Sequence, residues 1–158
     1  MAWSFTRQRE SAVNTGLIRE WFHTPGIAYA PTAATVEKFT ITGGDILVHL
    51  MYAKILTTLE AVASNVSVVI NPTTGTSGTV ATTAEGNGLV AGDTVLVEGD
   101  GTAAIVSASV KWFTLGGPSP FLAFIGGLDI IHAAAQTGSI QWHLFWEPLN
   151  ASSTVVAA

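Results

Sequence analysis

Four histidines and a few acids are the side chains of this sequence that are best suited to chemistry. The histidines are His23, His49, His132 and His143. Asp129 lies three residues before His132, and His143 lies four residues before Glu147. In a strand, an odd spacing puts two side chains on opposite faces, and four residues span about 13 Å. Neither pair is a chelate on its own, so we expect no metal site.

Nucleophilic and phosphate-binding chemistry has no signature here either. The G-x-S-x-G turn that carries the nucleophile of many hydrolases is absent. Asp93, Glu98 and Asp100 are clustered, but they flank turns, where solvated carboxylates are the simplest interpretation. The glycine-rich runs 86–88 and 99–101 lack the third glycine of a dinucleotide-binding fingerprint. The sequence therefore predicts a protein that is not an enzyme and that uses no cofactor.

The elements that position these side chains are predicted to be strands. Residues 36–42 alternate between two faces, and residues 46–57 form the long apolar run of a strand covered on both sides. Residues 140–147 show the strictest alternation, which indicates a sheet with one buried face. The buried positions predicted there are Ile140, Trp142, Leu144 and Trp146.

Shorter strands are expected between glycine and proline turns, at residues 27–30, 66–70, 93–98, 104–115 and 121–125. Residues 73–88 are rich in threonine, glycine and serine and are expected to form a surface loop. Roughly eight to ten short strands predict an all-β, single-domain protein. The expected architecture is a β-sandwich or jelly-roll-like barrel over residues 25–158.

Residues 1–24 differ from this body and are expected to form an N-terminal arm or a short helix. Val13, Leu17, Ile18 and Trp21 fall at near-helical spacing. In one interpretation the arm lies on the body; in the other it anchors the protein to a partner through aromatic and arginine side chains, which are enriched at binding hot spots. The candidate partner-binding residues are Trp3, Phe5, Arg7, Arg9, Arg19, Trp21 and Phe22.

Charge is scarce and unevenly placed. Only 11% of the 158 residues are charged, and the net charge is −5, whereas about 25% is usual for soluble domains. All three arginines lie within the first twenty residues. A weakly acidic body argues against a nucleic-acid partner, which needs a basic footprint. The chain lacks cysteine, which suits synthesis in the cytoplasm.

No membrane association is expected. The strongest apolar stretch, residues 121–135, is interrupted by two glycines, Asp129 and His132, and a spanning helix needs about 20 apolar residues. A surface with so few charges is instead typical of a protein whose faces are covered by other proteins, or coated by neutral threonine, serine and glycine. Both alternatives favour an assembled structural protein.

Three segments resemble small structural proteins of tailed bacteriophages. Residues 137–149, Thr-Gly-Ser-Ile-Gln-Trp-His-Leu-Phe-Trp-Glu-Pro-Leu, match the typical ending G-S-[IV]-x-W-x-L-x-[YW]-x-P-L, which a tail of small residues follows. Residues 39–48 and 66–75 look similar as well, so that the likeness covers about residues 27–158. The aromatic N-terminal arm is not part of it.

The resemblance implies a virion protein made in the host cytoplasm and placed on the capsid surface. Its expected role is a capsid decoration (cement) protein or a head-fibre base, and its expected partners are the major capsid protein or other virion proteins. We expect a homotrimer, because closed cyclic assembly covers low-charge side faces. The alternative is a carbohydrate- or receptor-binding β-sandwich of a phage fibre, which would expose Trp112 or Trp142 in a groove.

Overall fold

The computed structural model describes residues 21–82, 88–97, 105–108 and 120–158. Across these ranges the regular secondary structure consists of strands, which turns and loops connect. No helix in these residues is long and apolar enough to cross a bilayer. The strands are β1 (Phe22–Pro25), β2 (Thr35–Thr42), β3 (Ile46–Thr57), β4 (Val66–Pro72), β5 (Gly78–Thr82), β6 (Thr94–Val97), β7 (Ile105–Ala108), β8 (Phe121–Ala123), β9 (Gly126–His132), β10 (Ser139–Pro148) and β11 (Thr154–Ala157).

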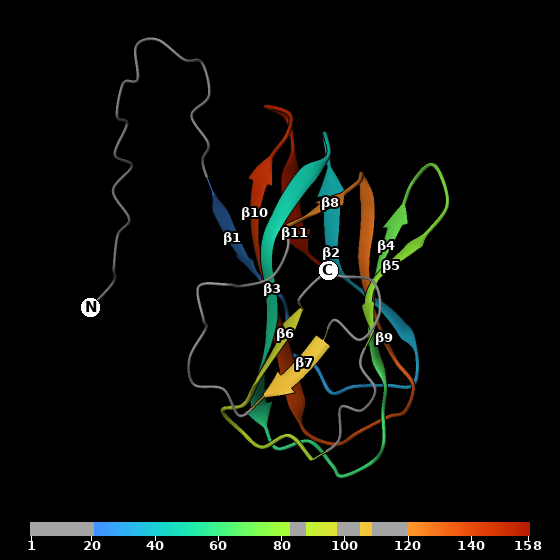
Figure 1. Cartoon of the computed structure of the whole chain (residues 1–158), viewed down its shortest axis with the longest axis vertical. Coiled ribbons are helices and arrows are strands. Elements are labelled where there is room, and N and C mark those ends of the chain that lie inside the picture. The colour runs from blue at the N-terminus through green and yellow to red at the C-terminus, as the bar shows by residue number, and fades with distance from the viewer. Residues whose placement is uncertain (1–20, 83–87, 98–104, 109–119) are drawn as a thin grey trace, which may run out of the picture.

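Two antiparallel sheets pack face to face, which confirms the predicted all-β sandwich. Sheet A has the order β1-β10-β3-β6-β7, with β8 also paired to β3. Sheet B has the order β11-β2-β9-β4-β5. Figure 1 shows β1, β10 and β3 on the left and β9, β4 and β5 on the right. The finer jelly-roll connectivity stays a prediction.

The pairing of β10 with β3 is the longest in the molecule and runs from Ser139 opposite Thr57 to Pro148 opposite Ile46. The predicted alternation in β10 is confirmed, because Ile140, Trp142 and Leu144 are buried while the residues between them are half-buried. The prediction that β3 is covered on both sides holds for one face only: its inner face lies in the core, whereas Leu47, Leu50 and Tyr52 on the outer face are half-buried.

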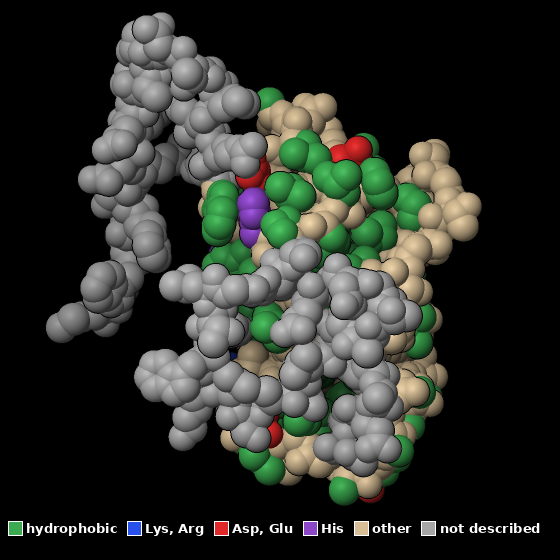
Figure 2. All heavy atoms as spheres, in the orientation of Figure 1, with side chains coloured by type: hydrophobic (Ala, Val, Ile, Leu, Met, Phe, Trp, Pro, Cys, Tyr) green, Lys and Arg blue, Asp and Glu red, His purple; other side chains and the backbone are tan. Residues whose placement is uncertain are grey.

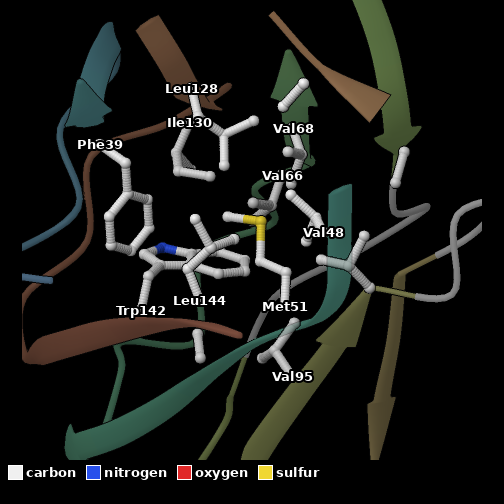
Figure 3. Packing of buried hydrophobic residues seen from close by; sticks show 14 of the residues in the cluster. Phe39, Val48, Met51, Val66, Val68, Val95, Leu128, Ile130, Trp142 and Leu144 are labelled. Atoms are coloured by element: carbon white, nitrogen blue, oxygen red, sulfur yellow. The ribbon is translucent and has the colours of Figure 1, made fainter. Parts of the chain in front are cut away.

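The core lies between the sheets and receives side chains from both. Figure 3 shows Phe39 of β2 and Ile130 of β9 meeting Trp142, Leu144 and Met51 from sheet A. All five side chains are fully buried. Truncating a large core side chain of this kind costs about 2–5 kcal/mol, because it leaves a cavity as well as losing contacts.

Several predicted strand positions are wrong, and two of the errors concern edge strands. The predicted loop 73–88 contains β5, and the C-terminal tail, which gave no strand signal, forms β11. Both are edge strands that bury little, so small and hydroxyl residues suffice there. The strand expected at residues 27–30 shrinks to one bridge between Tyr29 and Ile140. Residues 126–132, for which no separate strand was predicted, form β9 at the centre of sheet B.

The expected boundary between arm and body falls inside β1. Residues 22–24, assigned to the arm from the sequence, pair with β10 at the edge of sheet A. The helical interpretation of the arm concerns residues 1–20, which lie outside the described ranges. Of residues 104–115, expected as one strand, 105–108 form β7 and the rest also lie outside the described ranges.

Several β-bulges interrupt the strand pairings, and two of them place a polar residue as the extra residue. In β3 the register passes from Leu50 to Val48, which leaves His49 as the extra residue. In β2 the register with β9 passes from Glu37 to Phe39, which leaves Lys38 as the extra residue. The extra residue of a bulge shifts the inward and outward alternation of the strand by one position. As a result, Val48 and Met51 are both buried although they are three residues apart, and Phe39 is buried whereas Glu37 is exposed.

A buried polar network closes one end of the sandwich. The Tyr29 hydroxyl lies 2.7 Å from Nε2 of His132 and accepts a hydrogen bond from Nε1 of Trp142 at 3.1 Å. The Lys38 ammonium lies 3.4 Å from the centroid of the Tyr29 ring. Lys38 and His132 are 5% and 2% exposed. The network thus joins β2, β9 and β10 through Tyr29.

Burial sets the protonation states of this network. Desolvation, together with the Lys38 charge, lowers the pKa of His132 to about 4, and desolvation also raises the pKa of Tyr29. Neutral His132 therefore accepts the Tyr29 hydrogen at Nε2, which leaves the tyrosine oxygen free to accept from Trp142. Protonating His132 would leave the Tyr29 hydrogen without this acceptor.

This arrangement predicts that stability falls as the pH drops from about 6.5 to about 4. The ordinary pKa of histidine is 6.5 and that of folded His132 is about 4, so between these values the unfolded chain binds a proton that the folded chain does not. The loss attributable to His132 should reach about 3 kcal/mol. Urea unfolding of the protein at pH 7.0 and at pH 4.5 measures it.

The matched variant is His132→Gln, which does not titrate. Asp129 has a raised pKa and acts in the opposite direction, so the comparison must be made between the protein and the variant at each pH. We expect the variant to lose clearly less stability on acidification. An equal loss in both proteins would contradict the assignment to His132.

Candidate functional site

The outer faces of the two sheets differ in chemistry. On sheet B, the residues that alternate with the core are mostly threonine, serine and acids, with a few valines and isoleucines among them. On sheet A, the corresponding positions of β3, β6, β8 and β10 are mostly leucine, aromatic residues and histidine. We call this second surface the aromatic face. It comprises Trp21, His23, Leu47, His49, Leu50, Tyr52, Leu96, Leu122, His143 and Phe145.

Four rings form the centre of the aromatic face. His23 stacks on Phe145, with ring centroids 4.4 Å apart, and Tyr52 stacks on His143 at 4.7 Å. The four rings are within 21° of parallel in each stacked pair. They come from β1, β10 and β3, so stacking ties three adjacent strands together across the outer surface.

The two histidines of this group also contact each other. Nε2 of His23 lies 3.2 Å from Nδ1 of His143. Desolvation lowers the pKa of both imidazoles, and their mutual repulsion and Lys54 lower that of His143 further. A neutral pair satisfies this contact, because one ring nitrogen donates and the other accepts.

A second ring group lies nearer the start of β1. Trp21 stacks on His49, with centroids 4.1 Å apart and planes 18° apart. His49 Nε2 in turn lies 3.0 Å from a carboxylate oxygen of Glu147. The bulge in β3 places the His49 side chain on this surface, where its ring stacks on the indole of Trp21. Trp21 remains 61% exposed, which leaves one face of its ring open.

The aromatic face continues into an exposed apolar rim at β8. Leu122 pairs with Leu47 on the outer side, and Leu122, Phe124, Ile125 and Leu149 are exposed. Figure 2 shows hydrophobic side chains gathered over β8 and the adjoining end of β3, with acids and a histidine at the border. A hollow of about 350 Å³ lies beside the rim and includes Asp45, Phe124 and Ile125 in its lining.

Of the seven candidate partner-binding residues, the structure places Trp21 and Phe22 and does not describe Trp3, Phe5, Arg7, Arg9 or Arg19. Trp21 belongs to the aromatic face. Phe22 points the other way and stacks on Trp146, with centroids 4.9 Å apart. Trp146 also donates a hydrogen bond from Nε1 to Thr24 at 3.0 Å. Phe22 therefore closes the edge of the core.

The histidines and acids paired along the sequence have other partners in space. His143 faces His23 and Tyr52, whereas Glu147 binds His49. His132 bonds Tyr29 inside the sandwich, and Asp129 lies on the outer face of sheet B. In the part of the chain that the structure describes, no three histidine, aspartate or glutamate side chains converge as metal ligands.

Of the two tryptophans that a carbohydrate-binding groove was expected to expose, the structure describes one. Trp142 is completely buried in the core, as the alternation of residues 140–147 predicts, so it supplies no exposed ring. Trp112 lies outside the described residues. Trp21, which the sequence analysis assigned to the arm, is the described tryptophan that has an exposed ring.

The aromatic face itself was not predicted, because it depends on strand order. Its signal in the sequence was the second face of residues 140–147, where His143 and Phe145 occupy positions that solvent-facing strands usually give to polar residues. Nothing in the sequence showed that β1 would bring His23 beside them. The outward position of His49 needed the bulge as well.

The attachment of β1 generates a prediction for two truncations. A chain that starts at residue 21 keeps β1, and a chain that starts at residue 26 loses it. The shorter chain should be less stable by about 2–4 kcal/mol, because it loses the Phe22–Trp146 and His23–Phe145 stacks and several hydrogen bonds. Chemical unfolding of both truncated proteins measures the difference, and equal stability would show that β1 is only loosely attached.

The aromatic face is thus a surface of stacked rings and leucines on adjacent strands of sheet A. Searches of protein-family models, of curated proteins and of solved structures find no match for the chain.

Proposed function

We propose that the chain is a non-enzymatic structural protein that binds other proteins through its aromatic face. Following the resemblance of residues 27–158, we propose further that the assembly is a bacteriophage head, on which the protein acts as a capsid decoration protein. The observation that supports a binding role most strongly is the apolar and aromatic outer face of sheet A. Its outer side carries leucines and aromatic rings, where an antiparallel sheet that faces water normally carries polar residues.

The energetics of this surface favour docking. Covering about 500 Å² of apolar surface contributes on the order of 12 kcal/mol before the costs of association. The rings are already held by stacking on one another, so little side-chain entropy remains to be lost on binding. Trp21 and Leu122 are the exposed anchors at two ends of the surface.

The scarcity of charge supports a repeated, close-packed setting. Charged residues make up 11% of the chain, and buried interface cores are depleted in charge relative to free surfaces. A homotrimer around a three-fold axis would cover side faces, leaving the aromatic face for the shell. The virion location and the trimer rest on the resemblance and on this composition argument.

A second candidate function is carbohydrate or receptor binding, and one observation favours it. Sugars stack on an aromatic ring that has an open face. The rings of His23, Phe145, His143 and Tyr52 are turned toward one another and do not favour such stacking. Trp21 has one face on His49 and is otherwise exposed. A glycan array separates the two functions: binding that is lost in Trp21→Ala would favour the carbohydrate role.

Shell binding should be lost when the aromatic face is made polar. We expect Leu122→Ser to weaken co-sedimentation of the protein with capsid shells of the phage that encodes it by at least about tenfold, because each lost anchor removes roughly 1.5–3 kcal/mol. The matched control is Val156→Ser, an equally exposed apolar residue on the outer face of sheet B. Equal loss in both variants would point to a general effect and contradict the assignment of the face.

The proposed trimer has its own measurement. Size-exclusion chromatography with light scattering at micromolar concentration should give three times the chain mass of 16.4 kDa. A clean monomer would contradict the trimer in solution and leave the shell-binding assignment to the previous experiment.

A further inference from the structure

The contact between His23 and His143 helps to attach an edge strand to the sandwich. His23 lies on β1, which in the described part of the chain pairs with β10 alone. Nε2 of His23 lies 3.2 Å from Nδ1 of His143, and the His23 ring stacks on Phe145 as well. β1 has only four residues, so side-chain contacts contribute a large part of its attachment.

The second ring nitrogen of His143 has no hydrogen-bond partner among the described residues. This Nε2 is buried from solvent, and Tyr52 stacks on the ring at a centroid distance of 4.7 Å. A buried N–H group without an acceptor is costly, whereas an unused lone pair is tolerated more often. The neutral pair therefore carries a hydrogen on Nδ1 of His143, which donates to Nε2 of His23, and none on the buried Nε2.

A pair that has gained one proton cannot satisfy this geometry. Of the four ring nitrogens, all but one then carry hydrogen. If the bare nitrogen is one of the two in contact, the pair keeps a charged hydrogen bond, but Nε2 of His143 becomes a buried N–H without an acceptor. If the bare nitrogen is either of the others, two N–H groups face each other across the contact between His23 and His143. Proton uptake therefore opposes the contact in every arrangement.

The titratable groups around the pair do not stabilise an added proton, within the ranges that the structure describes. On β3, Lys54 is positive and repels a charge on His143, and Tyr52 is uncharged because burial raises the pKa of its hydroxyl. The acid of β10, Glu147, contacts His49 instead. The rest of β1, β6 beside β3, and β11 near β1 contain no titratable side chain.

We propose that the contact between His23 and His143 is an acid-sensitive latch that holds β1 on sheet A. The neutral pair keeps β1 attached. Below about pH 6.5, where a solvated histidine gains its proton, the pair accepts one only when β1 leaves the sheet and both rings reach water. Release moves Trp21 away from His49, so the aromatic face loses the two rings that precede and form β1. The consequence for binding rests on the proposed function, whereas the latch itself does not.

Nitrogen NMR of the full-length protein, labelled in its histidines, tests the pair directly. Desolvation lowers the pKa of both His23 and His143 from 6.5, so both rings should still be neutral at pH 6.5, where an isolated histidine is half protonated. As the pH falls further they should titrate together, because interacting groups share their titration steps. A midpoint at the ordinary value for either ring, independent of the other, overturns the proposal.

Hydrogen exchange at pH 7.0 and at pH 5.0, corrected for the intrinsic pH dependence of exchange, tests the release of β1. We expect the amides of β1 to lose at least about tenfold more protection than those of β9, because a pKa lowered by one unit changes the opening equilibrium by that factor. β9 lies at the centre of sheet B and reports the general loss of stability that His132 causes. If β1 keeps its protection relative to β9, the proposal is wrong.

Three variants assign the effect to this pair. His23→Phe retains a ring that can stack on Phe145 but does not titrate, so its β1 should stay as protected relative to β9 at pH 5.0 as at pH 7.0. His143→Phe removes the other partner and should give the same result. The control His49→Gln changes a histidine outside the pair and should release β1 on acidification as the parent protein does. Release of β1 in both phenylalanine variants, or its retention in His49→Gln, overturns the assignment. The measurement needs no binding partner, so its outcome is separate from that of the shell-binding experiment.

Discussion

The pairing of β10 with β3 is the interaction on which the rest of the structure depends. β10 contributes Trp142 and Leu144 to the core on one side and His143 and Phe145 to the aromatic face on the other. It also provides the edge to which β1 attaches. A one-residue slip in this register would exchange the two sets, exposing an indole and burying an imidazole. The core and the aromatic face therefore both depend on the register of β10.

The bulges at His49 and Lys38 show how the sandwich places polar side chains without losing its core. Val48 and Met51 around His49 are both buried, and so is Phe39, which follows Lys38. The extra residue lets the apolar residues before and after it lie in the core. It also gives the polar residue a partner: His49 contacts Trp21 and Glu147, and Lys38 contacts Tyr29. In β2 the same shift brings Glu37 opposite Asp129.

The sequence could predict what depends on local pattern. The strands around Phe39, Met51 and Trp142 show strong alternation or long apolar runs, and their existence follows from burial alone. Edge strands such as β5 and β11 bury little and leave no such pattern. The His23–Phe145 stack and the Glu37–Asp129 pair join residues far apart in the chain. Such contacts follow from strand order and register, which residue types do not encode locally.

The two outer faces show that few charges do not mean one kind of surface. On the outer face of sheet A, leucines and stacked rings occupy positions where solvent would favour polar residues. Covering this face therefore lowers the free energy. On sheet B, threonine and serine satisfy water without net charge, and two of the few acids are concentrated at one point instead of being spread out. Even spacing would be the simplest way to use scarce charges for solubility. Glu37 and Asp129 instead lie opposite each other, a position in which like charges destabilise a sheet.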